Sequence, residues 1–172
     1  MQLSGLTGFY HYLGDGQRGV YDWPPSEGSL LPEEAAPLAS TLARHTATPS
    51  VCWFAVWDGF GATREDLQNA PTFALPHRRY FLLRGSVGEV TETTNPLSTW
   101  HQSANLWWPD DHAWCVATEI DINTTYIACA EACSDDILGM RELEAFEINP
   151  ATGIAWASDL VNPEPQYGLP PG

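Results

Sequence analysis

The stretch WHQSANLWWPDDHAWCVATEIDINTTY, residues 100–126, predicts the centre of the fold. Two apolar runs, 106–108 and 113–122, flank a Pro-Asp-Asp sequence that is typical of a tight turn. Together they predict a β-hairpin. Because successive side chains of a strand point to opposite faces of a sheet, Trp107 and Trp108 are expected to point in opposite directions. One of them can then be buried while its neighbour faces outward.

The elements on either side of this hairpin favour an α+β fold. Residues 51–57, VCWFAVW, are apolar at every position, as expected of a central strand. Pro32 and the two glutamates after it suit the first turn of a helix. The expected helices span 32–45 and 131–140, and the other expected strands span 72–75, 79–83, 143–148 and 153–156. Because strands cluster instead of alternating with helices, we expect a mainly antiparallel sheet with two or three helices packed on one face.

A single domain over residues 1–161 is expected, followed by an extended Pro-rich tail over 162–172. At 172 residues the chain can bury a sizeable core without a metal or a disulfide. It contains no run near the ~20 apolar residues needed to span a bilayer. Met1 is not followed by a basic and then an apolar segment. These features predict a soluble, cytoplasmic protein whose four cysteines are reduced thiols.

The charge of the chain is strongly negative. The sequence has 22 carboxylates and seven basic residues, all of them arginine, which gives a formal net charge of −15. Such a surface repels phosphate backbones and anionic lipid, so neither nucleic acid nor a membrane is an expected partner. It would instead speed encounter with a basic protein. Solubility, or a high-GC bacterial genome that favours arginine over lysine, is the alternative explanation of this composition.

Motifs of known chemistry are missing. The sequence has no GxxxxGK, GxSxG or HExxH motif, and its cysteines and histidines do not have the spacing of a zinc site. No metal and no cofactor are therefore predicted. The remaining catalytic candidates are Glu119, Asp121 and His112. Glu119 and Asp121 share one face of the expected strand, where a carboxylate pair could serve acid-base or Mg²⁺ chemistry in a metal-dependent hydrolase.

The structural alternative for Glu119 is that this side chain is substantially buried and paired with an arginine of RRYFLLR, residues 78–84. A buried carboxylate needs a charged or hydrogen-bonded partner. This interpretation predicts that strand 79–84 lies next to strand 113–120. It also predicts that Glu119→Gln destabilises the fold by about 1–3 kcal/mol, because the arginine loses its charged partner.

The tryptophans and acids of the hairpin indicate a different function. Aromatic side chains are preferred anchors of protein interfaces, and an acidic rim selects a basic partner. We therefore expect a non-enzymatic protein-binding module, immunity-like or regulatory, that binds a basic protein; the sequence assigns no oligomeric state. The expected partner-binding residues are Trp100, Trp107, Trp108, Asp110 and Asp111. Packing in the core is the alternative for the tryptophans.

Three phrases of the sequence support a resemblance. HTATPSVCWFAVWDGFG, RRYFLLRG and NLWWPDDHAWCVATEIDINTTY resemble a group of Trp-rich actinobacterial proteins of unknown function, over roughly residues 22–162. The resemblance implies no activity. In its acidity and scattered tryptophans the chain is also similar to immunity proteins of bacterial toxin systems, without a shared motif.

Overall fold

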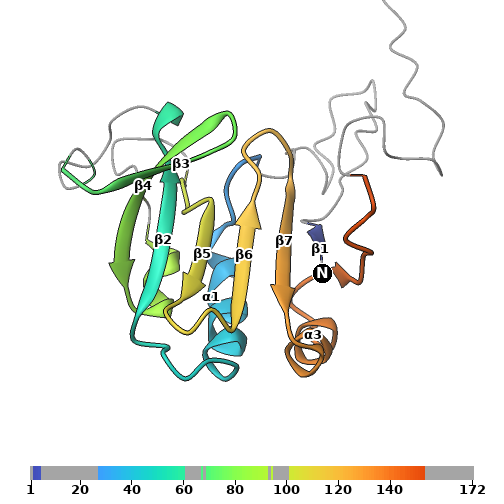
Figure 1. Ribbon diagram of the computed structural model, residues 1–172. Helices are drawn as coiled ribbons and strands as arrows, with labels where there is room; N and C mark the ends of the chain where they lie inside the picture. The colour runs from blue at the N-terminus through green and yellow to red at the C-terminus, as the bar shows by residue number, and fades with distance from the viewer. Residues whose placement is uncertain are drawn as a thin grey trace, which may run out of the picture.

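The predicted α+β architecture, with a mainly antiparallel sheet, is confirmed by the computed structural model (Figure 1). The structure describes residues 2–4, 27–60, 67, 69–92, 94 and 101–153. One sheet runs in the order β3-β4-β2-β5-β6-β7-β1-β8, and each strand pairing given for it is antiparallel. Its strands are β1 Gln2–Ser4, β2 Cys52–Trp57, β3 Thr72–Leu75, β4 Arg78–Gly85, β5 Leu106–Pro109, β6 Trp114–Thr118, β7 Thr124–Cys129 and β8 Ala145–Phe146.

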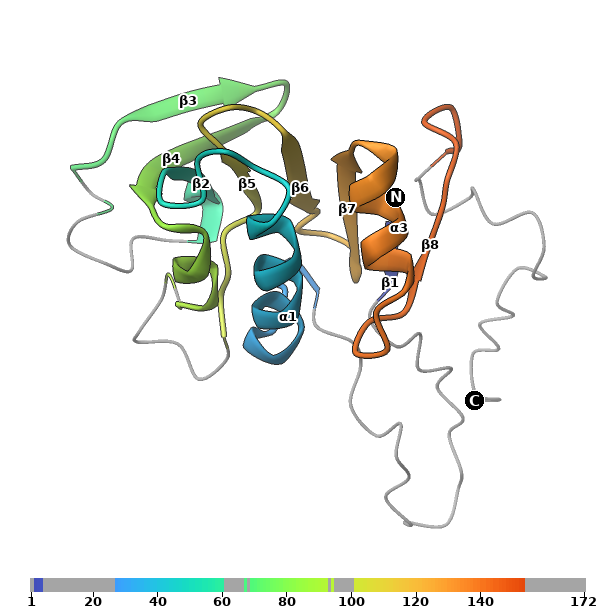
Figure 2. The same ribbon diagram turned by 90° about the horizontal axis from the view of Figure 1, so that it is seen from below.

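α1, Pro32–Ala43, lies against one face of the sheet, and α3, Glu131–Leu138, lies beside the end of β7 (Figures 1 and 2). The chain also forms the 3-10 turns η1 Asp58–Phe60 and η2 Val87–Thr91. α1 begins at Pro32 as predicted, with Glu33 and Glu34 in its first turn, where the helix dipole favours negative charge. α1 packs against α3 and η2. The expected boundary at residue 162 lies outside the described residues.

The hairpin predicted over 106–122 forms, but its second strand is shorter than expected. β5 pairs with β6, which ends at Thr118. Residues 119–123 then turn the chain into a separate strand, β7, which pairs back along β6. The expected strand over 143–148 is only β8, and it pairs with β1. Its expected hairpin partner, 153–156, lies outside the described residues except for residue 153.

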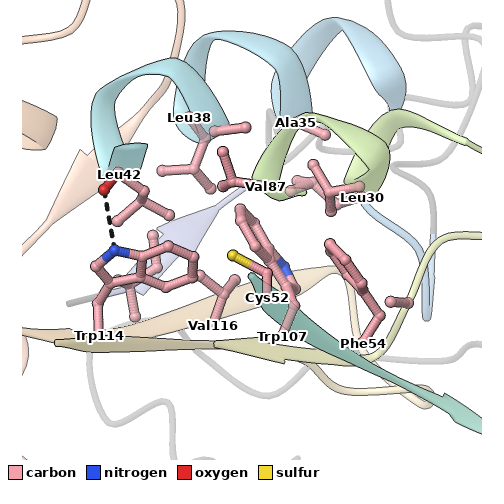
Figure 3. Packing of buried hydrophobic residues seen from close by; sticks show 14 of the residues in the cluster. Leu30, Ala35, Leu38, Leu42, Cys52, Phe54, Val87, Trp107, Trp114 and Val116 are labelled. Atoms are coloured by element: carbon pink, nitrogen blue, oxygen red, sulfur yellow. Dashed lines mark hydrogen bonds between the residues drawn. The ribbon is translucent and has the colours of Figure 1, made fainter. Parts of the chain in front are cut away.

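The face of the sheet under α1, called the helix face below, holds the main core. Figure 3 shows Trp107 and Trp114 rising from the sheet toward Leu38 and Leu42 of α1. Trp107 packs edge-on against Trp114, with ring centroids 5.2 Å apart. The indole Nε1 of Trp114 donates a hydrogen bond to the Leu42 carbonyl oxygen at 2.9 Å, which satisfies the polar tip of a buried ring.

The opposite face, called the aromatic face below, carries the alternate residues of the same strands. Trp53 pairs with Trp108 across β2 and β5, and both are half-buried. The β3–β4 hairpin bends over this face (Figure 1), so Phe73 of β3 contacts Trp108 of β5, although β4 and β2 separate these strands in the sheet. Their ring centroids are 6.3 Å apart. Trp57 also lies on this face and is half-buried, so that Trp53, Trp57 and Trp108 form a second aromatic layer.

The buried side chain of Asn105 connects β2 to the segment before α1. Its Oδ1 accepts a hydrogen bond from the Trp57 backbone N–H at 2.8 Å, and its Nδ2 donates to the Gly28 carbonyl at 3.2 Å. Gly28 has φ +69°, and a Cβ there would lie 2.9 Å from the Ile120 carbonyl oxygen, so only glycine fits this approach.

Candidate functional site

An arginine holds the two carboxylates that the sequence singled out. Arg78 Nη2 donates to Glu119 Oε1 at 2.6 Å and to Asp121 Oδ2 at 2.8 Å. The guanidinium also lies 5.5 Å from the centroid of the Trp57 ring. The hydrogen bond to Asp121 raises the pKa of Arg78, against the opposing effect of desolvation. The predicted contact between Glu119 and an arginine of 78–84 is therefore confirmed.

The predicted strand arrangement around this contact is wrong. β4 is not a neighbour of β6, because β2 and β5 lie between them. The contact forms because the β3–β4 hairpin bends over the aromatic face and brings Arg78 to the far end of β6 (Figure 1). The prediction that Glu119 is substantially buried is also wrong. Its side chain is 36% exposed, because β6 ends at Thr118 and Glu119 begins the following turn.

This exposure lowers the expected effect of Glu119→Gln. Exposed ion pairs typically contribute about 0–1 kcal/mol, and Arg78 keeps its hydrogen bond to Asp121 in the variant. We therefore expect Glu119→Gln to lower the free energy of unfolding by about 1 kcal/mol or less, measured by urea denaturation. A double-mutant cycle with Arg78→Gln isolates the pair. A loss well above this value would show that Glu119 is buried and that the geometry given above is incorrect.

The third catalytic candidate, His112, lies away from the carboxylates. It is an exposed residue of the β5–β6 turn, with φ 55°. β6 separates it from Glu119, and seven residues of extended chain span about 20 Å. Within the described ranges, no group of three His, Cys, Asp or Glu residues is placed to hold a metal ion. The structure thus brings Glu119 and Asp121 together but does not bring His112 to them.

Of the three tryptophans expected to bind a partner, one is buried, one is half-buried and one lies outside the described residues. Trp107 is 0% exposed and belongs to the helix-face core, so it cannot contact a partner. The prediction that Trp107 binds a partner is therefore wrong, because α1 covers the face to which Trp107 points. Trp108 points to the other face, as expected for its neighbour, and is half-buried against Phe73. Trp100 lies outside the described residues.

The two acids of the hairpin turn are exposed and engaged in hydrogen bonds. Asp110 Oδ1 accepts from the indole Nε1 of Trp53 at 3.0 Å. Asp111 accepts from the Thr46 hydroxyl and from the Ala47 backbone N–H, both at 2.7 Å. Asp111 therefore ties the β5–β6 turn to the loop between α1 and β2. Its geometry indicates a structural role for this carboxylate.

Asp111 makes stability depend on pH in the acid range. The hydrogen bond from Thr46 is the main cause that lowers the pKa of this carboxyl below 3.8. A lowered pKa in the folded state means that the stabilisation is complete above the unfolded-state pKa and is lost as pH falls through the folded value. Asp111→Ala should therefore lower Tm at pH 7, and the difference from wild type should shrink below pH 3.8.

The matched control for this comparison is Asp135→Ala, which removes an exposed carboxylate of α3. Thermal melts at neutral and acid pH measure the difference in Tm between each variant and the wild-type protein. An equal Tm for Asp111→Ala and wild type at pH 7 would contradict the role given to Asp111.

A second surface, the segment 131–147, was missed by sequence reasoning. It comprises α3, β8 and the loop between them, which lie side by side at one end of the sheet (Figures 1 and 2). We call it the acidic end. It carries six carboxylates and one arginine, a formal charge of −5 on 17 residues. Its carboxylates are Glu131, Asp135, Asp136, Glu142, Glu144 and Glu147, and its arginine is Arg141.

The acidic end also exposes apolar side chains. Leu138 is 38% exposed and Phe146 is 43% exposed. Among the described residues, the only other large hydrophobic side chain exposed to this degree is Leu75, at 45%. The sequence does carry a signal for this surface. Arg141 is the only Lys or Arg after Arg84, so the carboxylates of 131–147 have little positive charge near them in the chain. Of these carboxylates, Asp136 is paired, with Arg44 Nη2 at 3.2 Å and His45 Nε2 at 2.8 Å.

Comparisons of the chain with protein-family models, with curated proteins and with solved structures find no match. Among the helices that the structure describes, none has the length and apolar character required to cross a membrane. Function is therefore inferred from the geometry of the described residues.

Proposed function

We propose that the protein is a non-enzymatic binding module whose acidic end binds a basic protein. The observation that carries the proposal is the coincidence of a −5 charge with exposed Leu138 and Phe146 on residues 131–147. Negative charge speeds the encounter with a positive partner, and exposed apolar side chains supply the area whose burial holds a complex together. Charge alone would give only a weak, salt-sensitive encounter.

The proposal keeps the function expected from sequence and changes the surface. Of the tryptophans and acids first expected to bind a partner, Trp107 is buried, and Asp110 and Asp111 accept hydrogen bonds within the protein. A toxin-neutralising role, such as that of immunity proteins in bacterial toxin systems, is the specific form that we favour. We propose that it acts in the cytoplasm, where its four free thiols would stay reduced. The negative charge disfavours nucleic acid as the partner.

The hydrolase alternative has no support from the described residues. The two carboxylates that would serve as base or metal ligand, Glu119 and Asp121, are both paired with Arg78. His112 lies at the opposite end of β6.

The proposal predicts a partner whose association depends on charge. Immobilised protein should retain from a lysate of the source cells, at low ionic strength, a protein of high isoelectric point. The association rate of that purified partner should fall by about tenfold or more between 0.05 and 0.5 M salt, because steering charges are screened. Surface plasmon resonance measures this rate.

Two double variants with the same change in net charge locate the surface. Glu144→Gln with Glu147→Gln removes two carboxylates from the acidic end and should slow association. Glu27→Gln with Glu33→Gln removes two exposed carboxylates elsewhere and should change it less. Failure of the wild-type protein to retain any basic protein would overturn the proposed function. Equal slowing by both double variants would overturn the assignment to the acidic end.

A further inference from the structure

A small pocket lies on the helix face beside β2, β4 and η2. Its apolar lining comprises Phe54, Leu83, Val90 and Ala104. Phe54 and Leu83 pair across β2 and β4, so both side chains point to the face on which Figure 3 shows Phe54. The pocket holds about 120 Å³, less than the roughly 300–1,000 Å³ of a site for a drug-sized ligand. It therefore suits a single side chain.

The edge of β4 beside this pocket has no neighbouring strand among the described residues. β3 begins at Thr72, which pairs with Phe81. The backbone N–H of Leu82 then donates to the Pro71 carbonyl at 2.8 Å, on the side away from β2. Backbone groups two residues apart in a strand point the same way, so the N–H and C=O of Arg84 also point away from β2. These two groups are thus placed to hydrogen-bond an added strand.

Negative charge lines the pocket. Glu89 and Glu92 contribute two carboxylates. Glu89 is held in place, because its Oε1 accepts a hydrogen bond from the Ser86 backbone N–H at 2.8 Å. Arg84 also borders the pocket, but its guanidinium carbon lies 5.8 Å from the centroid of the Trp53 ring, on the aromatic face. A group that enters the pocket therefore meets an apolar lining and two negative charges.

We propose that this pocket binds a lysine side chain on an extended segment of another protein, and that the segment pairs with the open edge of β4. The aliphatic stem of the lysine lies on the apolar lining, while its ammonium meets the carboxylates of Glu89 and Glu92. Lysine suits a pocket of this size better than arginine, because an ammonium is more compact than a planar guanidinium. Main-chain hydrogen bonds to a sheet edge, combined with a side-chain pocket, are a common mode of peptide recognition.

This site is separate from the acidic end and exists whether or not that end binds a partner. The acidic end includes β8, at one edge of the sheet, whereas the pocket adjoins β2 and β4 toward the other edge. Lysine is absent from this chain, so the segment must come from a different protein and not from a second copy.

Nuclear magnetic resonance of the isotope-labelled protein tests the site with three probes. They are the peptide acetyl-Ala-Lys-Ala-amide, the same peptide with norleucine in place of lysine, and n-butylamine, which is the lysine stem and ammonium alone. We expect the lysine peptide to shift the amide signals of Leu83, Arg84 and Val90 saturably. The norleucine peptide should bind about fivefold more weakly, because it lacks the charge. Butylamine should also bind more weakly than the lysine peptide, because it cannot pair with β4.

A matched pair of variants tests the carboxylates. Glu92→Gln should remove most of the preference for lysine over norleucine, whereas Glu147→Gln, the same charge change on the acidic end, should keep it. An equal preference in the two variants would overturn the role given to Glu92.

The wild-type protein decides the outcome even if a variant fails to fold. Absence of saturable shifts at the pocket would overturn the proposal, and equal affinity for the two peptides would overturn the choice of lysine. Butylamine binding as tightly as the lysine peptide would overturn the pairing with β4 and make a free amine the occupant.

Discussion

Asn105→Ala should lower the free energy of unfolding by about 2–4 kcal/mol, because it removes the hydrogen-bond partner of a part-buried backbone N–H and of a buried backbone carbonyl at once. Asn105 is 2% exposed. Its side chain satisfies the Trp57 N–H at 2.8 Å and the Gly28 carbonyl at 3.2 Å. Alanine can replace neither hydrogen bond, and an unsatisfied buried donor or acceptor costs about 1–3 kcal/mol. Urea denaturation followed by far-UV circular dichroism gives the difference.

The matched control for Asn105 is Asn149→Ala. Asn149 makes a comparable hydrogen bond, from the Ala151 N–H to its Oδ1 at 2.8 Å, but in an exposed loop where water replaces it. Its loss should cost about 0.5 kcal/mol or less. Similar effects of the two substitutions would show that Asn105 is not the buried link between the sheet and the segment before α1.

Trp107→Ala should cost about 3–5 kcal/mol, as large aromatic-to-alanine changes in a core do. The ring is 0% exposed and packs on both Phe54 and Trp114. Trp107→Phe should cost much less, because it keeps most of the volume. The Trp107 indole N–H also makes no hydrogen bond with the described residues that a phenyl ring would lose. The same urea titrations compare the two variants.

The neighbouring tryptophan provides the control for Trp107. Trp108 is half-buried on the aromatic face, so Trp108→Ala removes less buried apolar area and should destabilise the protein less than Trp107→Ala. The reverse order of these two effects would mean that the faces of β5 have been assigned the wrong way round.

Much of the fold could be predicted because its signals are local. The turn at Pro109, Asp110 and Asp111 and the helix start at Pro32 depend on the conformational preferences of a few adjacent residues. The even apolarity of 51–57 predicts a central strand because both of its faces are covered by side chains. The end of β6 at Thr118 was missed, since the apolar pattern continues through Ile120 and Ile122 while pairing with β7 requires a turn.

The site could be predicted only in part, because it depends on contacts between distant segments. The need of a carboxylate for a positive partner predicted the contact of Glu119 with an arginine. The bending of the β3–β4 hairpin that delivers Arg78 has no local signal. Which face α1 covers decides that Trp107 is buried, and the sequence of β5 does not contain that information. Leu138 and Phe146 were missed because apolar residues are expected inside.

The central claim is that the acidic end contacts the partner, and hydroxyl-radical footprinting of the complex tests it most directly. Leu138, Phe146 and Leu75 are similarly exposed in the free protein, at 38%, 43% and 45%, so each serves as a control for the others. We predict that binding protects Leu138 and Phe146 from oxidation and leaves Leu75 unchanged. Protection of Leu75 and Trp108, with Leu138 and Phe146 still oxidised at their free rates, would contradict the claim and place the partner on the aromatic face.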